Sequence, residues 1–239
     1  MTEFTISGEK EPFLIVTMEK GDKIFAESDS LLAMQDGIEI AGEARGGILA
    51  SLGRVFSSDE DFFQQTLSAE KDSVVMLSPT IPGDIKLLKL EDGKSYYLND
   101  YAFFAGEDTI NLETELNGSV GNALFSGDGL FILHANGEGT LAINGLGSIE
   151  EIELDEESGD LIVDNGHLLA WDDTISYSAE MVNSNSSSGF FRRTLNSFTS
   201  GEGIMMRLRG NGKIYIASRN LNNFTGFINS VVVHPENRE

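Results

Sequence analysis

The sequence contains no cysteine and only 4 prolines and 1 tryptophan among its 239 residues. Without cysteine the chain has no disulfides, thiolate metal sites or thiol catalysis, which fits a reducing cytoplasm. No apolar run approaches the roughly 18 residues that a membrane-spanning helix needs. The polar, acidic segment Met1–Glu11 lacks the basic start and apolar core of a secretory signal. We therefore expect a cytoplasmic protein without a transmembrane segment.

Basic residues are also few, because 16 Lys and Arg stand against 39 Asp and Glu, for a net charge of −23. Such a charge repels nucleic-acid backbones and anionic membranes, so we expect no nucleic-acid partner. The distribution is uneven, since residues 190–239 hold 7 basic and 3 acidic residues. Solubility alone explains an acidic surface. The basic end favours contact with an acidic surface of the same chain, a neighbouring subunit or a partner.

The 26 glycines punctuate short alternating apolar segments, and amphipathic helical stretches are scarce. This pattern predicts many short strands. The best helix candidate is Asp59 to Leu67, although its Phe62-Phe63 and the residues that follow fit a strand equally well.

One segment occurs three times, at Gly21–Ile38, Gly93–Ile110 and Gly159–Ile175. Each copy carries two large apolar residues and an alanine, with the alanine five residues before the final isoleucine. The triplets are Leu31-Leu32-Ala33, Phe103-Phe104-Ala105 and Leu168-Leu169-Ala170. Repeated units bury their apolar faces against one another. We therefore expect the central residues of the three triplets to occupy similar environments.

A second motif combines a Ser-Gly-acidic-Gly turn, a strand, Gly-x-Gly and another strand, at residues 126–143 and 200–216. A looser copy spans residues 74–90. We interpret each as a β-hairpin with a three-residue glycine loop. In the last copy this register places Leu208 opposite Ile214 and turns Arg207 and Arg209 outward.

These patterns predict an all-β protein in which three β repeats form one compact body over residues 1–239. The repeats are arranged about a pseudo-threefold axis. The first repeat covers about residues 1–50 together with parts of its neighbours. The second covers residues 51–118, and the third covers residues 119–235. The polar stretch 183–189 is predicted to be a mobile loop.

The order of these motifs, ending in the segment from Val163 to Trp171, resembles a bacterial and archaeal family. Its mitochondrial relatives are named for altered inheritance of mitochondria. The resemblance covers roughly residues 1–235, and only the turn Ser57-Ser58-Asp59-Glu60 departs from the family's glycine-rich start. It implies a fold similar to the tryptophan RNA-binding attenuation protein, with triplicated short double-stranded β-helix or β-sandwich units. It also implies no established enzymatic activity and, for mitochondrial members, a link to inner-membrane organisation.

The residues suggest no catalytic, cofactor-binding or metal-binding site. The alternation turns His134 outward, and His167 and His234 lie far from it in sequence. A metal site in a double-stranded β-helix needs closely spaced histidines and a carboxylate on inward-facing strands. Asp108 and Asp173 occupy equivalent repeat positions, where we expect turn-forming side chains that accept a backbone N–H. We therefore predict that the protein is not an enzyme and holds no cofactor.

The one surface set with a physical peculiarity is cationic: Arg207, Arg209, Lys213 and Arg219. On so acidic a chain, this set is a candidate docking face for an acidic or phosphorylated partner. The alternative is that these residues pair with carboxylates of the same molecule.

Three function hypotheses follow. The favoured one is a non-enzymatic scaffold or interaction module that binds an unknown protein partner or itself. A peripheral link to membrane or envelope maintenance rests on the resemblance alone. The alternative is a protein that binds a small molecule or ion between β units. The least favoured is a hydrolase that uses paired carboxylates.

Overall fold

The structure is a computed structural model that describes residues 2–42, 64–114, 132–181 and 204–232. Within these residues the chain forms 19 strands and one α-helix, α3 (Leu221–Val231), together with two 3-10 turns, η1 (Asp100–Ala102) and η2 (Asn165–His167). The predicted all-β class is confirmed. Short alternating segments bounded by glycine form the strands, because successive side chains point to opposite faces.

The strands form four antiparallel sheets, named here A to D. Sheet A contains, in order, β1 (Glu3–Ser7), β2 (Phe13–Met18), β7 (Ser73–Leu77) and β4 (Leu31–Met34). Sheet B contains β5 (Ile38–Gly42), β6 (Gln64–Ala69), β3 (Lys23–Glu27), β10 (Phe103–Glu107), β13 (Gly139–Leu146) and β8 (Gly83–Leu90).

The second half of the chain supplies most of the other two sheets. Sheet C contains β11 (Ile110–Thr114), β12 (Ile132–Gly137), β9 (Tyr96–Asn99), β16 (Leu168–Asp172), β19 (Gly212–Ala217) and β14 (Ile149–Leu154). Sheet D contains β15 (Leu161–Asp164), β18 (Ile204–Arg209) and β17 (Ser176–Met181).

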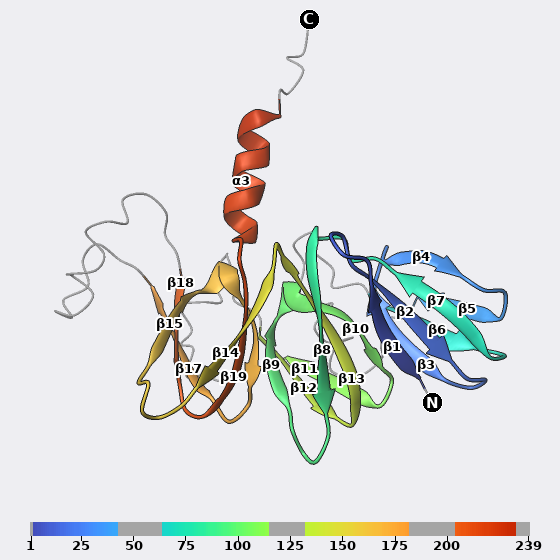
Figure 1. Ribbon diagram of the computed structural model, residues 1–239, viewed down its shortest axis with the longest axis horizontal. Coiled ribbons are helices and arrows are strands. Elements are labelled where there is room, and N and C mark those ends of the chain that lie inside the picture. Colours follow the sequence, from blue (N-terminus) through green and yellow to red (C-terminus); the bar gives the residue numbers. More distant parts are fainter. Residues whose placement is uncertain (1, 43–63, 115–131, 182–203, 233–239) are drawn as a thin grey trace, which may run out of the picture.

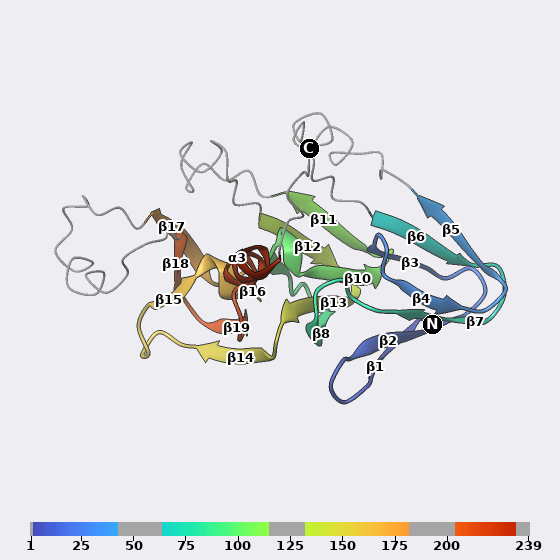
Figure 2. The same ribbon diagram turned by 90° about the horizontal axis from the view of Figure 1, so that it is seen from above.

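Successive sheets pack face to face, A on B, B on C and C on D. Figures 1 and 2 show sheets A and D toward opposite ends of the long axis of the molecule. Three apolar cores fill the spaces between them. Leu14, Leu67 and Phe104 belong to the core between A and B. Leu98 and Leu141 belong to that between B and C, and the core between C and D includes Trp171, Met206 and Leu208. Burial of these side chains is the main stabilising contribution to the stack.

Sheets B and C are built alike at their centres. In sheet B, β10 pairs with β3, with Ala105 opposite Ala26 and Gly106 opposite Phe25. In sheet C, β16 pairs with β9 in the same way, with Ala170 opposite Leu98 and Trp171 opposite Tyr97. Each sheet thus joins three strands of one sequence region to three strands of the next.

The three triplets found in the sequence share one backbone irregularity. The register of β4 against β7 shifts between Leu31 and Ala33. The register of β10 against β13 shifts between Phe103 and Ala105, and that of β16 against β19 between Leu168 and Ala170. The central residue of each triplet, Leu32, Phe104 or Leu169, therefore sits at a β-bulge, which re-aims its side chain.

The expectation of similar environments is wrong for one of these residues. Phe104 and Leu169 are fully buried, whereas Leu32 is 53% exposed. The cause is position in the sheets, because β10 and β16 lie inside six-stranded sheets and β4 lies at the edge of sheet A.

The predicted hairpins are also wrong. Strands β12 and β13 belong to sheets C and B, β18 and β19 to sheets D and C, and β7 and β8 to sheets A and B. The chain therefore crosses a core at these points instead of turning back beside itself. The alternation predicted the buried side correctly for Leu208 and Ile214, but hydrogen-bond partners do not follow from alternation.

Two of these crossings, from β12 to β13 and from β18 to β19, depend on glycines of the Gly-x-Gly segments. Gly137 and Gly210 have φ of 109° and 132°. A Cβ atom on Gly137 would lie 2.4 Å from the carbonyl oxygen of Thr109, and one on Gly210 would lie 2.9 Å from that of Thr174. The threonine hydroxyls reinforce each crossing, since Thr109 Oγ1 donates to the carbonyl of Glu138 at 2.5 Å.

Several sequence predictions fall on residues outside the described ranges. These are the loop at 183–189, the Ser-Gly-acidic-Gly turns, and His234. Of the helix candidate Asp59 to Leu67, the described part belongs to strand β6, so no helix forms there. Helix α3, the one α-helix among the described residues, was not predicted from the sequence.

Candidate interaction surfaces

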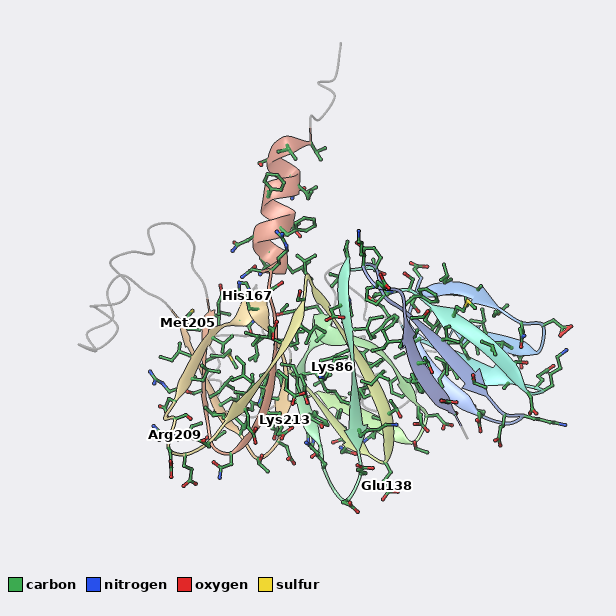
Figure 3. All side chains as sticks on the ribbon, in the orientation of Figure 1. Lys86, Glu138, His167, Met205, Arg209 and Lys213 are labelled. Carbon is green, nitrogen blue, oxygen red and sulfur yellow. The ribbon has the colours of Figure 1, made fainter. Side chains whose placement is uncertain are left out.

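Helix α3 projects away from the sheets (Figures 1 and 3), and it carries an apolar face. The face comprises Phe224, Phe227, Ile228 and Val231, spaced as neighbours on one side of a helix. Phe227 is 60% and Val231 55% exposed, and none of the 11 helix residues is buried against the described part of the chain. The exposed apolar residues make this face of α3 a candidate interaction surface.

Asn220 joins this helix to the β-sheets. Its Oδ1 accepts a hydrogen bond from the backbone N–H of Asn223 at 3.0 Å, an N-cap of the helix. Its Nδ2 donates to Asp164 Oδ2 at 3.1 Å, and Asp164 Oδ1 accepts from the backbone N–H of Gly166. A Cβ on Gly166 would lie 2.2 Å from the Asn220 amide, so only glycine admits this contact.

Strand β4 presents a second apolar surface. Besides Leu32, Met34 is 45% exposed. The corresponding positions in register are Gly106, packed against Phe25, and Trp171, which is fully buried. Sheet A therefore ends in an edge strand whose side chains are apolar where edge strands usually carry charge.

The structure separates the four cationic residues of the predicted docking face. Arg207 and Arg209 lie on β18 in sheet D, Lys213 lies on β19 in sheet C, and Arg219 follows β19. Figure 3 shows Arg209 near the outer end of the stack, apart from Lys213. The four do not form one face of one sheet.

Asp160 binds both arginines of β18. Arg209 donates from Nε to Oδ1 at 2.6 Å and from Nη2 to Oδ2 at 2.8 Å. Arg207 donates from Nη1 to Oδ2 at 3.2 Å. The hydrogen bonds from Arg209, and then those from Arg207, hold the pKa of Asp160 below its ordinary value despite desolvation. These arginines therefore serve an internal ion pair.

Lys213 also pairs within the chain. Its Nζ lies 2.5 Å from Glu151 Oε1, and Lys86 Nζ lies 3.1 Å from Glu151 Oε2. The Lys213 contact is the main cause that lowers the pKa of Glu151, and it raises the pKa of Lys213. Burial raises the pKa of Tyr215, whose ring Lys86 overlies at 5.9 Å. This network links β8 of sheet B to β14 and β19 of sheet C.

The two described histidines are used in packing and hydrogen bonding. His134 is half-buried against the ring of Tyr97, with centroids 4.9 Å apart, so its predicted outward position is only partly correct. His167 Nδ1 lies 2.8 Å from the carbonyl oxygen of Ala217. Among the described residues, no three His, Asp or Glu side chains cluster as metal ligands.

An aromatic cluster lies in the core between sheets C and D. Tyr97, Trp171 and Tyr177 approach one another, with ring centroids 5.2 to 5.7 Å apart. Trp171 Nε1 and His134 Nε2 are buried without a hydrogen-bond partner among the described residues. Trp171 is fully buried. A buried N–H without a partner calls for an explanation.

Of the two equivalent aspartates, Asp173 accepts a hydrogen bond from the side chain of Ser95. Ser95 Oγ donates to its Oδ2 at 2.5 Å. The backbone N–H of Asp108 donates to the carbonyl of Lys23 at 3.3 Å. The neighbouring threonines, Thr109 and Thr174, make the local side-chain bonds of these turns.

The profile of the family described as mitochondrial biogenesis AIM24 matches residues 4–219. The chain belongs to the mitochondrial biogenesis AIM24 family. The resemblance stated from the sequence motifs is thereby confirmed. An uncharacterised protein of Streptococcus pyogenes serotype M6 is 32% identical over 231 residues, which cover 93% of this chain and 88% of that protein.

A solved structure shares the architecture. The crystal structure of a Streptococcus pyogenes protein superposes with a TM-score of 0.76 at 30% identity, over 97% of this chain and 100% of that one. Helix α3 begins at Leu221, after the last residue of the family match. In the described residues, no helix has the length and apolar character needed to cross a bilayer.

Proposed function

We propose that the protein is a non-enzymatic interaction module of the bacterial cytoplasm that seats the apolar face of α3 in a groove of a protein partner. The exposed helix carries the proposal. An 11-residue helix is too short to be stable alone in water, so its persistence depends on contacts beyond its own backbone. Residues spaced at i, i+3, i+4 and i+7 are the anchors of helix-in-groove binding.

The charge of the helix supports a protein groove over an anionic membrane. Helix α3 contains no Lys, Arg, Asp or Glu, whereas helices that lie in membrane interfaces carry basic residues on the polar face. The rest of the chain is strongly acidic, which opposes approach to anionic lipid. The membrane link implied by the family is therefore a weaker proposal.

The test compares two double variants of the full chain. Phe227→Asp with Val231→Asp disrupts the apolar face, and Asn222→Asp with Asn229→Asp adds the same charge to the polar face. After cross-linking in cells, partners bound through the face are retained by the control and lost from the first variant. Equal recovery with both variants would contradict the proposal. Flotation with anionic and neutral vesicles identifies a lipid partner instead.

A second candidate, binding of a small molecule between sheets, is favoured by the buried Trp171 Nε1 that lacks a partner. A ligand that stacks on Tyr97 and Tyr177 could accept a hydrogen bond from Trp171 Nε1 and so satisfy this donor. Trp171 is the only tryptophan, so its fluorescence reports directly on binding. A saturable change in emission together with a rise in Tm, both lost in Trp171→Phe, supports this candidate.

For the cationic residues we propose a role in internal ion pairs in preference to a role in docking a partner. Arg207, Arg209 and Lys213 each contact a carboxylate of the same chain. Charge reversal at Arg209 and Lys213 then lowers stability and leaves partner recovery unchanged. Loss of a partner without loss of stability supports the docking face predicted from sequence.

We also propose that the body contains three copies of a six-strand unit: β2–β7, β8–β13 and β14–β19. Their supports are the shared bulge, the shared register at β3–β10 and β9–β16, and the shared order of strands in sheets B and C. These bounds differ from the three sequence ranges given above, which remain a prediction. The arrangement about a threefold axis, similar to the tryptophan RNA-binding attenuation protein, stays a prediction.

A further inference from the structure

We propose that β4 of one copy pairs antiparallel with β15 of a second copy, which joins sheet A of one chain to sheet D of the next. The inference is independent of helix α3. The predicted register places Ala33 opposite Val163, Met34 opposite Ile162 and Gln35 opposite Leu161.

The two internal junctions supply the template. Sheet B consists of β5-β6-β3 followed by β10-β13-β8, and sheet C of β11-β12-β9 followed by β16-β19-β14. Sheet D ends in the corresponding series β17-β18-β15, and sheet A begins, from its β4 edge, with β4-β7-β2. Sheets D and A are therefore the two halves of a third sheet of the same order.

The register follows from the same template. Gly106 lies opposite Phe25, and Trp171 lies opposite Tyr97. Counting from the shared bulge, Met34 occupies the position of Gly106 and Trp171. Counting from the partner strand β18, Ile162 occupies the position of Tyr97, because Ile162 pairs with Arg207 as Tyr97 pairs with His134.

Exposure marks the place where a neighbour is missing. Leu32 is 53% exposed, and its counterparts Phe104 and Leu169 are fully buried by the adjacent sheet. In the joined sheet, Leu32 lies on the side of sheet D that carries Val163, which packs toward sheet C. Ile152 and Ile216 on sheet C are only partly buried there, which leaves apolar surface for Leu32 to cover.

A second copy is the occupant because the two edges lie at opposite ends of the stack. Figure 1 shows β4 toward one end and β15 toward the other, with β8, β13, β9 and β12 between them. One chain so arranged does not bring its own edges together. Pairing of two different edges is a heterologous contact, which produces a closed ring or an open series of chains.

Cysteine cross-linking tests the register, since the natural chain has no cysteine. Purified full-length Met34→Cys and Ile162→Cys chains are mixed and oxidised. Directly opposite residues in antiparallel strands have Cα atoms about 4.5–5.5 Å apart, within disulfide range. We expect a reducible band at twice the 26.0 kDa chain mass, at least about tenfold stronger than the control. The control replaces Met34→Cys with Ile40→Cys, on edge strand β5.

The solution state gives a separate measurement. Light scattering after size exclusion should give a mass above that of one chain, falling to one chain in Leu32→Glu with Met34→Lys. A monomeric natural chain at all concentrations overturns the proposal. So does a Met34→Cys, Ile162→Cys double variant that forms its disulfide within one chain. If Met34→Cys fails to fold, Gln35→Cys with Leu161→Cys tests the same register, and no cross-link from either pair overturns it.

Discussion

Asn220 and Asp164 join the base of helix α3 to the end of strand β15, through a hydrogen bond of 3.1 Å between Nδ2 and Oδ2. The same asparagine caps the helix. One side chain therefore fixes both the start of the helix and its position on the sheets, and the connection is the natural first target for mutation.

Asn220→Ala should loosen α3 without unfolding the sheets. Loss of an N-cap costs about 1 kcal/mol, and here the tether to Asp164 is lost as well. Hydrogen exchange of the amides of Leu221–Val231 should accelerate, while Tm of the sheets stays unchanged. Asn222→Ala serves as the control, because Asn222 lies two residues further along the chain and does not cap the helix. Equal exchange in the two variants would contradict the assigned cap.

Gly137→Ala should destabilise the fold more than Gly93→Ala. Both glycines have positive φ, so an alanine at either position costs about 1 kcal/mol in backbone strain. Only at Gly137 does the new Cβ meet another atom, the carbonyl oxygen of Thr109 at 2.4 Å. Overpacking adds roughly 1–3 kcal/mol. The free energy of unfolding from urea titrations measures the difference, and similar losses at both sites would count against the crossing geometry.

Leu169→Ala should lower the stability of the isolated chain, whereas Leu32→Ala should weaken association between copies. Truncation of the fully buried Leu169 costs about 2–5 kcal/mol of folding free energy. Truncation of the exposed Leu32 changes the stability of an isolated chain by within about 0.5 kcal/mol, and it weakens association between copies instead. Denaturation of dilute protein and sedimentation of concentrated protein separate the two effects. A large loss of stability for Leu32→Ala in dilute protein would be unexpected.

Arg209→Met should raise the pKa of Asp160. In the natural protein its folded pKa lies below the unfolded value, so the ion pair stabilises the fold above the ordinary pKa of about 3.9. That contribution is lost as the pH falls through the lowered folded pKa. Carboxyl carbon NMR titration measures the shift directly, with Asp155, whose pKa Ser158 lowers, as an internal reference that should not move.

The all-β class and the buried faces could be predicted from the sequence, because alternation and glycine placement are local properties. The pairing of strands could not. Leu208 and Ile214 were correctly expected on the buried side, yet they face each other across a core instead of along a hairpin. Both arrangements bury the same side chains, and only the other sheets decide between them.

The candidate surfaces were predicted less well. The cationic set was selected by charge, and its carboxylate partners Asp160 and Glu151 are distant in sequence from it. Helix α3 was missed because it is short and rich in asparagine, a weak helix former. Two signals could have found it, namely Asn220 as a cap and the spacing of Phe224, Phe227, Ile228 and Val231.

The difference between the edges β4 and β15 gives any assembly of this chain a direction. A chain whose β4 edge is blocked can still bind the free β4 edge of another chain through its own β15. After it has bound, that end of the series presents only the blocked β4, so no further chain can add to it. Such a variant acts as a terminator, and small amounts of it would shorten polymers of the natural protein in proportion to the dose.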